Sequence, residues 1–195
     1  GGVISEAGDV TKTGGGTFTL SGTNTYTGTT TISGGELALD GSIAGDGVVD
    51  PGGTLAGGGT VGGNLDNGGT ITPAGGAIGT LTVNGDLAHQ AGAVTGLEVD
   101  GDGNTDQVAV GGAATLAGGT VAVSQDPAGS ATYGFSTDYT FLNAAGGVAG
   151  QYDNLLCNIP FLDPYLLYSG NDVTLRLLLN NINFGMGATS EAGGA

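Results

Sequence analysis

Residues 14–39 read GGGTFTLSGTNTYTGTTTISGGELAL, and this stretch decides the fold. Apolar residues alternate with polar or small ones in its short runs, as in TFTL at 17–20 and ELAL at 36–39. Neighbouring side chains of a β-strand point to opposite faces, so each run has one apolar face and one small or polar face. The glycines between the runs allow tight bends. The stretch therefore predicts short strands separated by turns.

The same unit recurs along the first two thirds of the chain, as GGTL at 52–55, GGTI at 68–71, GTLTV at 79–83 and GGTVAV at 118–123. The glycine pairs that begin at 34, 52 and 68 are 18 and 16 residues apart. A two-stranded ribbon could not hide its apolar face stably, whereas stacked coils cover one another. A unit recurring at roughly 20 residues predicts a solenoid. The alternative, a β-sandwich, usually has longer strands and more aromatic residues.

The composition agrees with an all-β chain. Glycine supplies 44 of the 195 residues, but 38% are hydrophobic and only 10% are charged, so there is apolar surface to bury. Threonine and valine suit strands, and glycine discourages long helices. We find no run of 18 apolar residues and no leader at the start, so the chain reads as a soluble excerpt of a longer protein.

The composition changes near residue 128. Nine of the eleven aromatic residues follow this point, and they can build a well-packed core. Two runs, YLLY at 165–168 and VTLRL at 173–177, flank a Ser-Gly-Asn-Asp turn and predict a hairpin. Because a solenoid needs its open end covered, we predict coils over 1–127, a cap over 128–184 and a linker over 185–195. The residues that we expect to form the core of the cap are Phe141, Leu155, Phe161, Leu162, Tyr165, Leu175 and Leu177.

The charge is strongly negative, with 18 acidic residues and two basic ones, Lys12 and Arg176, for a net charge of −16. This balance excludes a nucleic-acid surface, which needs clustered basic residues, and argues against anionic lipid. Arg176 alternates with two leucines, so we expect it to face solvent or to pair with an acidic neighbour. Cys157 is the only cysteine, so no internal disulfide forms, and we expect it to act as a small buried hydrophobe.

Two features carry weak signals for a metal site. The oxygen-bearing residues Asp100, Asp102, Asn104 and Asp106 alternate as in the opening of a Ca²⁺ loop. Thr105 replaces the required glycine and Gly111 the bidentate glutamate, so an acidic surface turn is the simpler interpretation. His89 is the only histidine, and neither a metal site nor a Ser-His-Asp site finds support around it. We therefore predict no metal and no cofactor.

An enzyme is a third possibility, because some polysaccharide lyases and hydrolases are parallel β-helices. A lyase needs a cationic residue, and the chain offers only two. A hydrolase needs paired carboxylates, which Asp46 with Asp50, or Asp100 with Asp102, could supply. Both pairs lie in glycine-rich turns, where aspartate is ordinary turn chemistry. We therefore expect no catalytic residues and no enzyme.

Three segments resemble autotransporter passengers of bacterial type V secretion. Residues 14–39 resemble the passenger repeat, with its S-G-x-N-x-Y-T-G segment and its Gly-Gly-x-Leu strand. Residues 106–123 are similar to the last coil-forming segment. Residues 139–180, with P-F-L-x-P-x-L and N-D-V-x-L, resemble the autochaperone region.

The resemblance implies a right-handed parallel β-helix that is exported through the outer membrane and exposed on the cell surface or released. It implies an anchoring C-terminal barrel and an upstream passenger as partners, and vectorial folding from an autochaperone cap. We therefore expect a stalk and a cap that promote folding and secretion. The alternative is an adhesin or self-associating module that binds a host surface or another copy; a carbohydrate-active enzyme is the third hypothesis.

Overall fold

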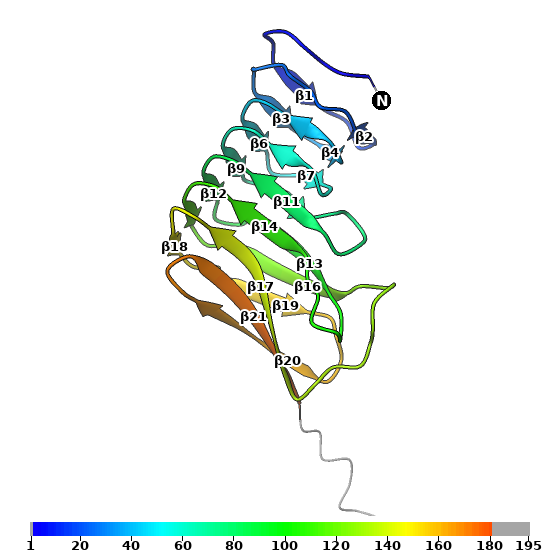
Figure 1. Cartoon of the computed structure of the whole chain (residues 1–195), viewed down its shortest axis with the longest axis vertical. Helices are drawn as coiled ribbons and strands as arrows, with labels where there is room; N and C mark the ends of the chain where they lie inside the picture. The colour runs from blue at the N-terminus through cyan, green and yellow to red at the C-terminus, as the bar shows by residue number, and fades with distance from the viewer. Residues whose placement is uncertain (1, 181–195) are drawn as a thin grey trace, which may run out of the picture.

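The computed structural model describes residues 2–180, and these form an elongated column of short strands (Figure 1). The strands make three seven-stranded sheets that run along the column. Residues 2–180 contain no helix, and so none that is long and apolar enough to cross a membrane. The predicted linker at 185–195 and the last residues of the predicted cap lie outside the described residues.

Each sheet takes one strand from each coil. The first sheet contains β1 (Val10–Lys12), β3 (Thr30–Ile32), β6 (Gly47–Val49), β9 (Leu65–Asn67), β12 (Leu87–His89), β15 (Ala114–Leu116) and β18 (Val148–Gly150). The second contains β2 (Thr17–Leu20), β4 (Gly35–Leu39), β7 (Gly53–Ala56), β10 (Thr70–Thr72), β13 (Val94–Val99), β16 (Thr120–Gln125) and β19 (Asn154–Cys157). The third contains β5 (Ser42–Ile43), β8 (Thr60–Val61), β11 (Thr80–Val83), β14 (Gln107–Val110), β17 (Ser136–Ala144), β21 (Asp172–Leu179) and β20 (Leu162–Tyr168).

Neighbouring coils pair in parallel and in register. The coil of β3, β4 and β5 lies against that of β6, β7 and β8, with Thr30 beside Gly47, Gly35 beside Gly53 and Ser42 beside Thr60. This confirms the predicted all-β parallel β-helix. Parallel strands need a long connection between them, and here the rest of the coil is that connection.

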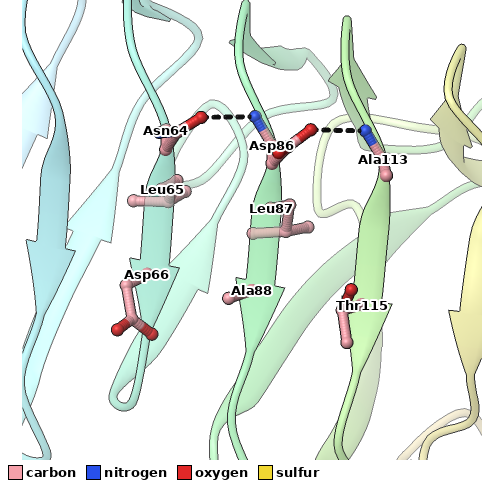
Figure 2. A pocket seen from close by; sticks show the side chains of 8 residues that line it. All are labelled: Asn64, Leu65, Asp66, Asp86, Leu87, Ala88, Ala113 and Thr115. Carbon is pink, nitrogen blue, oxygen red and sulfur yellow. Dashed lines mark hydrogen bonds between the residues drawn. The ribbon is translucent and has the colours of Figure 1, made fainter.

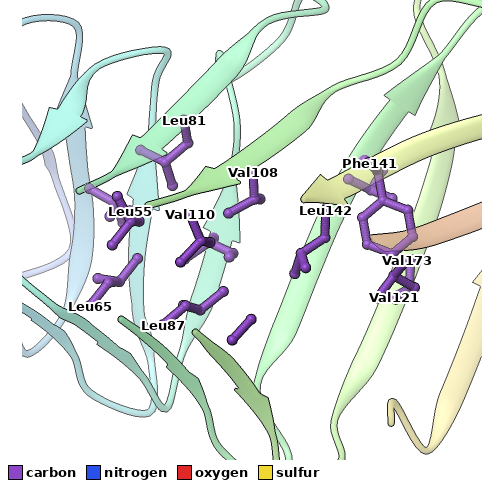
Figure 3. Packing of buried hydrophobic residues seen from close by; sticks show 14 of the residues in the cluster. Leu55, Leu65, Leu81, Leu87, Val108, Val110, Val121, Phe141, Leu142 and Val173 are labelled. Carbon is purple, nitrogen blue, oxygen red and sulfur yellow. The ribbon is translucent and has the colours of Figure 1, made fainter. Parts of the chain in front are cut away.

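The core is a column of inward side chains. In the second sheet Leu37, Leu55 and Ile71 lie on successive coils, and each is at most 1% exposed. Figure 3 shows the same stacking farther along the column, where Leu81 of β11 lies near Val108 of β14. Full burial of one such side chain stabilises the fold by roughly 1.5–3 kcal/mol.

The coils lengthen toward the C-terminus. The first repeat runs from Val10 to its neighbour Thr30, which is 20 residues, and the last from Ala114 to Val148, which is 34 residues. The extra residues lie at the corner between the second and third sheets, in the loops 73–79, 100–106 and 126–135. These loops follow the glycine pairs at 34, 52 and 68, so they widen only the spacing to the later pair at 118.

The third sheet changes from parallel to antiparallel pairing at its C-terminal end. Strand β17 pairs in parallel with β14 on one side and antiparallel with β21 on the other, and β21 then pairs antiparallel with β20. Strands β20 and β21 are the predicted hairpin. We call residues 2–127 the stalk and residues 128–180 the cap. Their boundary at 127–128 stays a prediction; it falls in the loop between β16 and β17.

Candidate functional site

The junction of cap and stalk depends on β17, a cap strand that pairs with β14 of the stalk. Its inward residues Tyr139, Phe141 and Leu142 are at most 1% exposed. The register against β21 shifts between Thr140 and Leu142. A bulge of this kind lets two successive residues face the same side. Figure 3 shows the result: Phe141 and Leu142 both point into the core, near Val173 of β21.

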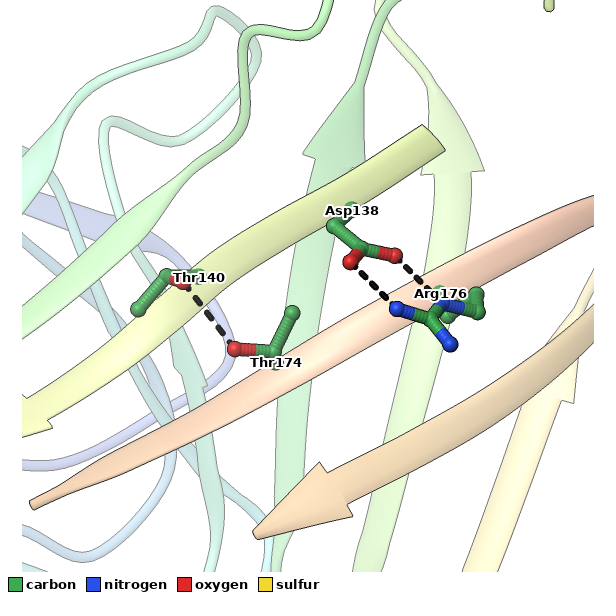
Figure 4. Close-up of polar contacts among 4 residues, drawn as sticks. All are labelled: Asp138, Thr140, Thr174 and Arg176. Carbon is green, nitrogen blue, oxygen red and sulfur yellow. Dashed lines mark hydrogen bonds and ion pairs between the residues drawn. The ribbon is translucent and has the colours of Figure 1, made fainter. Parts of the chain in front are cut away.

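Polar pairs on the outer face align β17 with β21 (Figure 4). The guanidinium of Arg176 donates through Nε and Nη2 to the two carboxylate oxygens of Asp138, both at 2.6 Å. The pair lowers the pKa of Asp138 below its usual value. Thr140 and Thr174 share a hydroxyl hydrogen bond of 3.0 Å. An exposed ion pair adds little stability, so its main effect is on register. The prediction that Arg176 faces solvent or pairs with an acidic neighbour is confirmed.

The structure buries some of the residues expected in the core of the cap and exposes others. Those that are buried, at 8% exposure or less, are Phe141, Leu162, Leu175 and Leu177. Leu155 is partly buried against the same core. Phe161 and Tyr165 are 51% and 50% exposed, so the placement of these two residues in the core was wrong.

A turn explains the exposure of Phe161, and the outward face of β20 explains that of Tyr165. Phe161 has a φ of +64° in the turn before β20, and this turn leaves half of its ring exposed. Tyr165 lies opposite Arg176 on the outer face of β20, whereas its neighbour Leu166 packs toward the core. Tyr139 and Val173 are buried but were not predicted, although each alternates with a residue that was. The burial of Leu142 depends on the bulge, for which the sequence gives no signal.

Behind β17, one aromatic residue of the cap enters the interior of the stalk. Tyr152 is 8% exposed; its hydroxyl group lies 3.2 Å from the hydroxyl group of Thr95 in β13. Its ring is 5.0 Å from the ring of His89 and inclined to it by 66°. Its backbone N–H donates to the hydroxyl group of Tyr168 at 3.0 Å. Desolvation raises the pKa of Tyr152, so the phenol stays neutral. We call the stalk residues Asn67, His89 and Thr95 the seat of the cap, because they hold Tyr152 directly or through His89.

His89 is fully buried within this seat, at 0% exposure. Burial lowers its pKa to about 4, and the Ala93 carbonyl offsets this only in part. Its Nδ1 lies 3.1 Å from Nδ2 of Asn67 on the neighbouring coil. Within the described residues, no group of three or more His, Cys, Asp or Glu side chains is arranged to hold a metal.

The loop 100–106 is held by its own acidic residues. One oxygen of Asp100 accepts hydrogen bonds from the backbone N–H groups of Asp102 and Asn104, and the other from the Asn104 side chain. The oxygens of Asp106 accept from the backbone N–H groups of Gly79 and Glu98. Desolvation raises the pKa of Asp106 to about 7. In these contacts the carboxylates of the weak Ca²⁺ candidate bind backbone amides and shape the corner.

The structure does not bring the carboxylates of Asp46 and Asp50 together. They precede and follow β6, at its opposite ends. Asp46 accepts a hydrogen bond from the backbone N–H of Asn64 at 2.7 Å, and Asp50 from the hydroxyl group of Ser33 at 2.8 Å. Each therefore serves a turn. Asp100 and Asp102 are adjacent, but Asp100 is committed to the amides of its own loop.

A shallow groove on the outer face of the first sheet shows how the coils are linked (Figure 2). The side chain of Asn64 accepts the backbone N–H of Asp86 at 2.9 Å, and the side chain of Asp86 accepts that of Ala113 at 2.8 Å. Asp66 and Thr115 line the same groove from neighbouring strands. The groove is open and has a mixed apolar and polar lining; its aspartates and threonine could meet a hydroxyl-rich ligand.

A comparison with protein-family models finds a match to one segment of the chain. Residues 10–39 match the family model described as the passenger-associated-transport-repeat. They run from the start of β1 to the end of β4 and so contain one complete coil step. A comparison with curated proteins finds none that matches the chain.

Proposed function

We propose, from the premise that this chain is part of an autotransporter passenger, that its cap nucleates folding and that its stalk grows from the cap. Such a passenger is secreted or exposed at the cell surface. In this proposal the C-terminal cap acts as an autochaperone that promotes export across the outer membrane of a bacterium, with a membrane barrel and an upstream passenger as partners. The stalk then displays the upstream region.

One observation supports the proposal above others: among the described residues, the cap contains the most local strand pairing. In the hairpin of β20 and β21, Leu166 pairs with Leu175 only nine residues away. In the stalk, the closest strand partners within a sheet, such as Thr54 and Thr70, are 16 residues apart. Closing a short loop costs less entropy than closing a long one, so local pairs form earlier.

Strand β17 lies between the hairpin and the stalk, so a hairpin that forms early can start assembly of the stalk. One edge of β17 is paired with the hairpin strand β21, and the other receives β14 of the preceding coil. A coil without a neighbour exposes its unpaired edges and its apolar interior. A β17 already held by β21 therefore supplies a prepared edge, and each added coil prepares the next.

Refolding kinetics test this order with two matched leucines. Leu175 in β21 and Leu81 in β11 belong to the same sheet, and both are 0% exposed. Replacing either with alanine should cost about 2–5 kcal/mol. We expect Leu175→Ala mainly to slow refolding of the 195-residue chain, whereas Leu81→Ala should mainly accelerate unfolding. The measurement is a pair of stopped-flow chevron plots.

The same two variants extend the test to cells. In the full-length parent, Leu175→Ala should lower the amount of passenger that reaches the cell surface more than Leu81→Ala does. If Leu81→Ala slows refolding as strongly as Leu175→Ala, the cap has no special place in nucleation and the proposal fails.

A binding role is the second candidate, and the groove on the first sheet favours it. Its Asp66, Asp86 and Thr115 lie on three successive coils, which suits a repeating polar ligand such as a glycan. Self-association is opposed by the net charge of −16. Glycan-array binding that is lost on Asp66→Ala would support adhesion. We propose no catalytic role, since the carboxylates weighed for hydrolysis serve turns.

A further inference from the structure

We infer that His89 is a proton-sensitive latch between cap and stalk. When its imidazole takes up a proton, the cap segment around Tyr152 leaves its seat, whereas the outer coils, at the N-terminal end of the stalk, stay folded. The inference goes beyond the proposed function, because it concerns how a folded cap is released. It holds whether or not the cap nucleates folding.

The latch begins with the position of His89 inside the solenoid. Strand β12 lies between β9 and β15, and His89 is in register with Asn67 on one side and Leu116 on the other. Tyr152 of the cap closes over it with a ring contact of 5.0 Å. His89 is thus a titratable stalk group that directly contacts the aromatic side chain through which the cap enters the interior.

The hydrogen bonds of Asn67 fix the tautomer of the imidazole. The side-chain oxygen of Asn67 accepts the backbone N–H of Gly69 at 3.2 Å, so the side-chain nitrogen faces His89 as a donor. Nδ1 of His89 therefore accepts, and in the neutral ring the proton is on Nε2. Nε2 has no hydrogen-bond partner within the described residues, and the Ala93 carbonyl near it does not complete one.

Protonation would disturb this arrangement at both nitrogens. A proton on Nδ1 would point at the NH₂ group of Asn67, so two donors would face each other at 3.1 Å. Nε2 would share the positive charge in a site of 0% exposure, where the Ala93 carbonyl offsets the desolvation only in part. A buried charge without a partner is costly, and the protein avoids it either by holding the neutral form or by opening.

The groups around His89 offer no ready counter-ion. On β9, Asn67 is uncharged and Asp66 faces outward, where it accepts a hydrogen bond from Gln90. Strand β15 contributes Leu116, and the corner before β13 contributes Ala93. From the cap come Tyr152, Tyr168 behind it, and Asp153.

Asp153 of the cap is engaged with the stalk backbone in the closed state. Its carboxylate accepts the backbone N–H of Gly119 at 3.2 Å. Gly119 lies directly against the imidazole, since a Cβ on it would come within 2.7 Å of Nε2. This glycine corner separates His89 from Asp153 in the closed state. When the segment opens, Tyr152 loses its ring contact and the imidazolium is hydrated by water.

The pH window follows from the shift of the His89 pKa from 6.5 to about 4. Because the closed state disfavours the proton, its stability is complete above pH 6.5 and falls as the pH drops toward 4. The equilibrium constant for opening should rise about tenfold per pH unit across this window.

Hydrogen exchange of the complete chain, followed by mass spectrometry, tests the latch. Between pH 7 and 4.5, after correction for intrinsic exchange, amides of residues 148–157 should lose about 100-fold of their protection. Amides of residues 30–56, in the outer coils, should lose much less. His89→Gln keeps a polar acceptor for Asn67 but does not titrate, so it should abolish the pH dependence at 148–157. Asp106→Asn, at the corner between the second and third sheets, should leave it intact.

NMR provides a readout that needs no variant. His89 is the only histidine, so one imidazole signal reports its protonation in the unmodified protein. We expect its titration midpoint to coincide with the opening of residues 148–157. The inference is overturned if opening persists in His89→Gln, if all coils open together, or if His89 titrates normally while the cap stays protected.

Discussion

The stalk and the cap are built from the same alternating strands, but they differ in strand pairing and in the side chains of their cores. In the stalk every strand has parallel neighbours, and its core consists mainly of aliphatic side chains such as Leu37, Leu55 and Ile71. The cap adds antiparallel pairing and aromatic side chains, Tyr139, Phe141 and Tyr152. A stack of equal coils can be extended indefinitely, whereas a structure that ends the stack needs a different pairing and larger side chains.

The largest expected effect comes from comparing one phenylalanine in each region. Phe141 in the cap is 0% exposed, and Phe18 in the stalk is 45% exposed on β2. Phe141→Ala should lower the free energy of unfolding by roughly 3–5 kcal/mol, and Phe18→Ala by about 1 kcal/mol or less. Guanidinium unfolding followed by circular dichroism measures both. Equal costs would mean that the aromatic core of the cap is no better packed than the outer coil.

A smaller effect is expected where the two regions share a buried polar contact. Thr95→Val leaves the Tyr152 hydroxyl group without its partner, and Tyr152→Phe does the same to Thr95. Each should cost about 1–3 kcal/mol, and the double variant should cost less than the sum.

Thr174→Val is the matched control. It breaks the exposed hydroxyl pair with Thr140, where water can replace the bond, so it should change stability by about 0.5 kcal/mol or less. Additive costs at Thr95 and Tyr152 would show that the contact does not couple cap to stalk.

Within the cap, Tyr165 tests the difference between its inner and outer faces. Because its ring is half exposed beside Arg176, Tyr165→Ala should cost about 1 kcal/mol or less, far below Phe141→Ala. Thermal unfolding of the two variants in parallel decides the matter. A cost near that of Phe141→Ala would restore Tyr165 to the folding core that the sequence predicted.

A comparison of predicted with observed burial in the cap shows what the sequence could predict. Alternation along single strands indicates which residues face inward, and it correctly placed Phe141, Leu175 and Leu177. It fails where the backbone departs from a regular strand, as at the positive φ of Phe161 and the bulge that buries Leu142.

Long-range contacts limited prediction further. The bond between Thr95 and Tyr152 joins residues 57 positions apart, so no local pattern pointed to it. His89 has no partner residue at a recognisable spacing. Its contacts arise only in the folded chain, where stacking of the coils places Asn67 beside it and the cap places Tyr152 against its ring.

The smallest expected effect concerns a carboxylate at the boundary between stalk and cap, and it depends on pH. Glu98 in β13 has a buried Oε2 that lacks a hydrogen-bond partner within the described residues. Desolvation, and then the charge of Asp126, raise its pKa. The folded chain therefore holds a proton on Glu98 more readily than the unfolded chain does. The contribution of Glu98 to stability is therefore complete below its ordinary pKa of 4.5 and is lost as the pH rises through the raised pKa.

Glu98→Gln removes this charge and keeps the shape of the side chain. We expect it to raise the melting temperature slightly at pH 8 and to leave it almost unchanged near pH 4, where Glu98 is protonated in the folded state. Glu36→Gln in β4 removes one charge of the same type from the stalk, and it controls for the relief of a net charge of −16. If both variants gain equally at pH 8, general repulsion accounts for the effect. A gain confined to Glu98→Gln places the penalty at the corner where the cap begins.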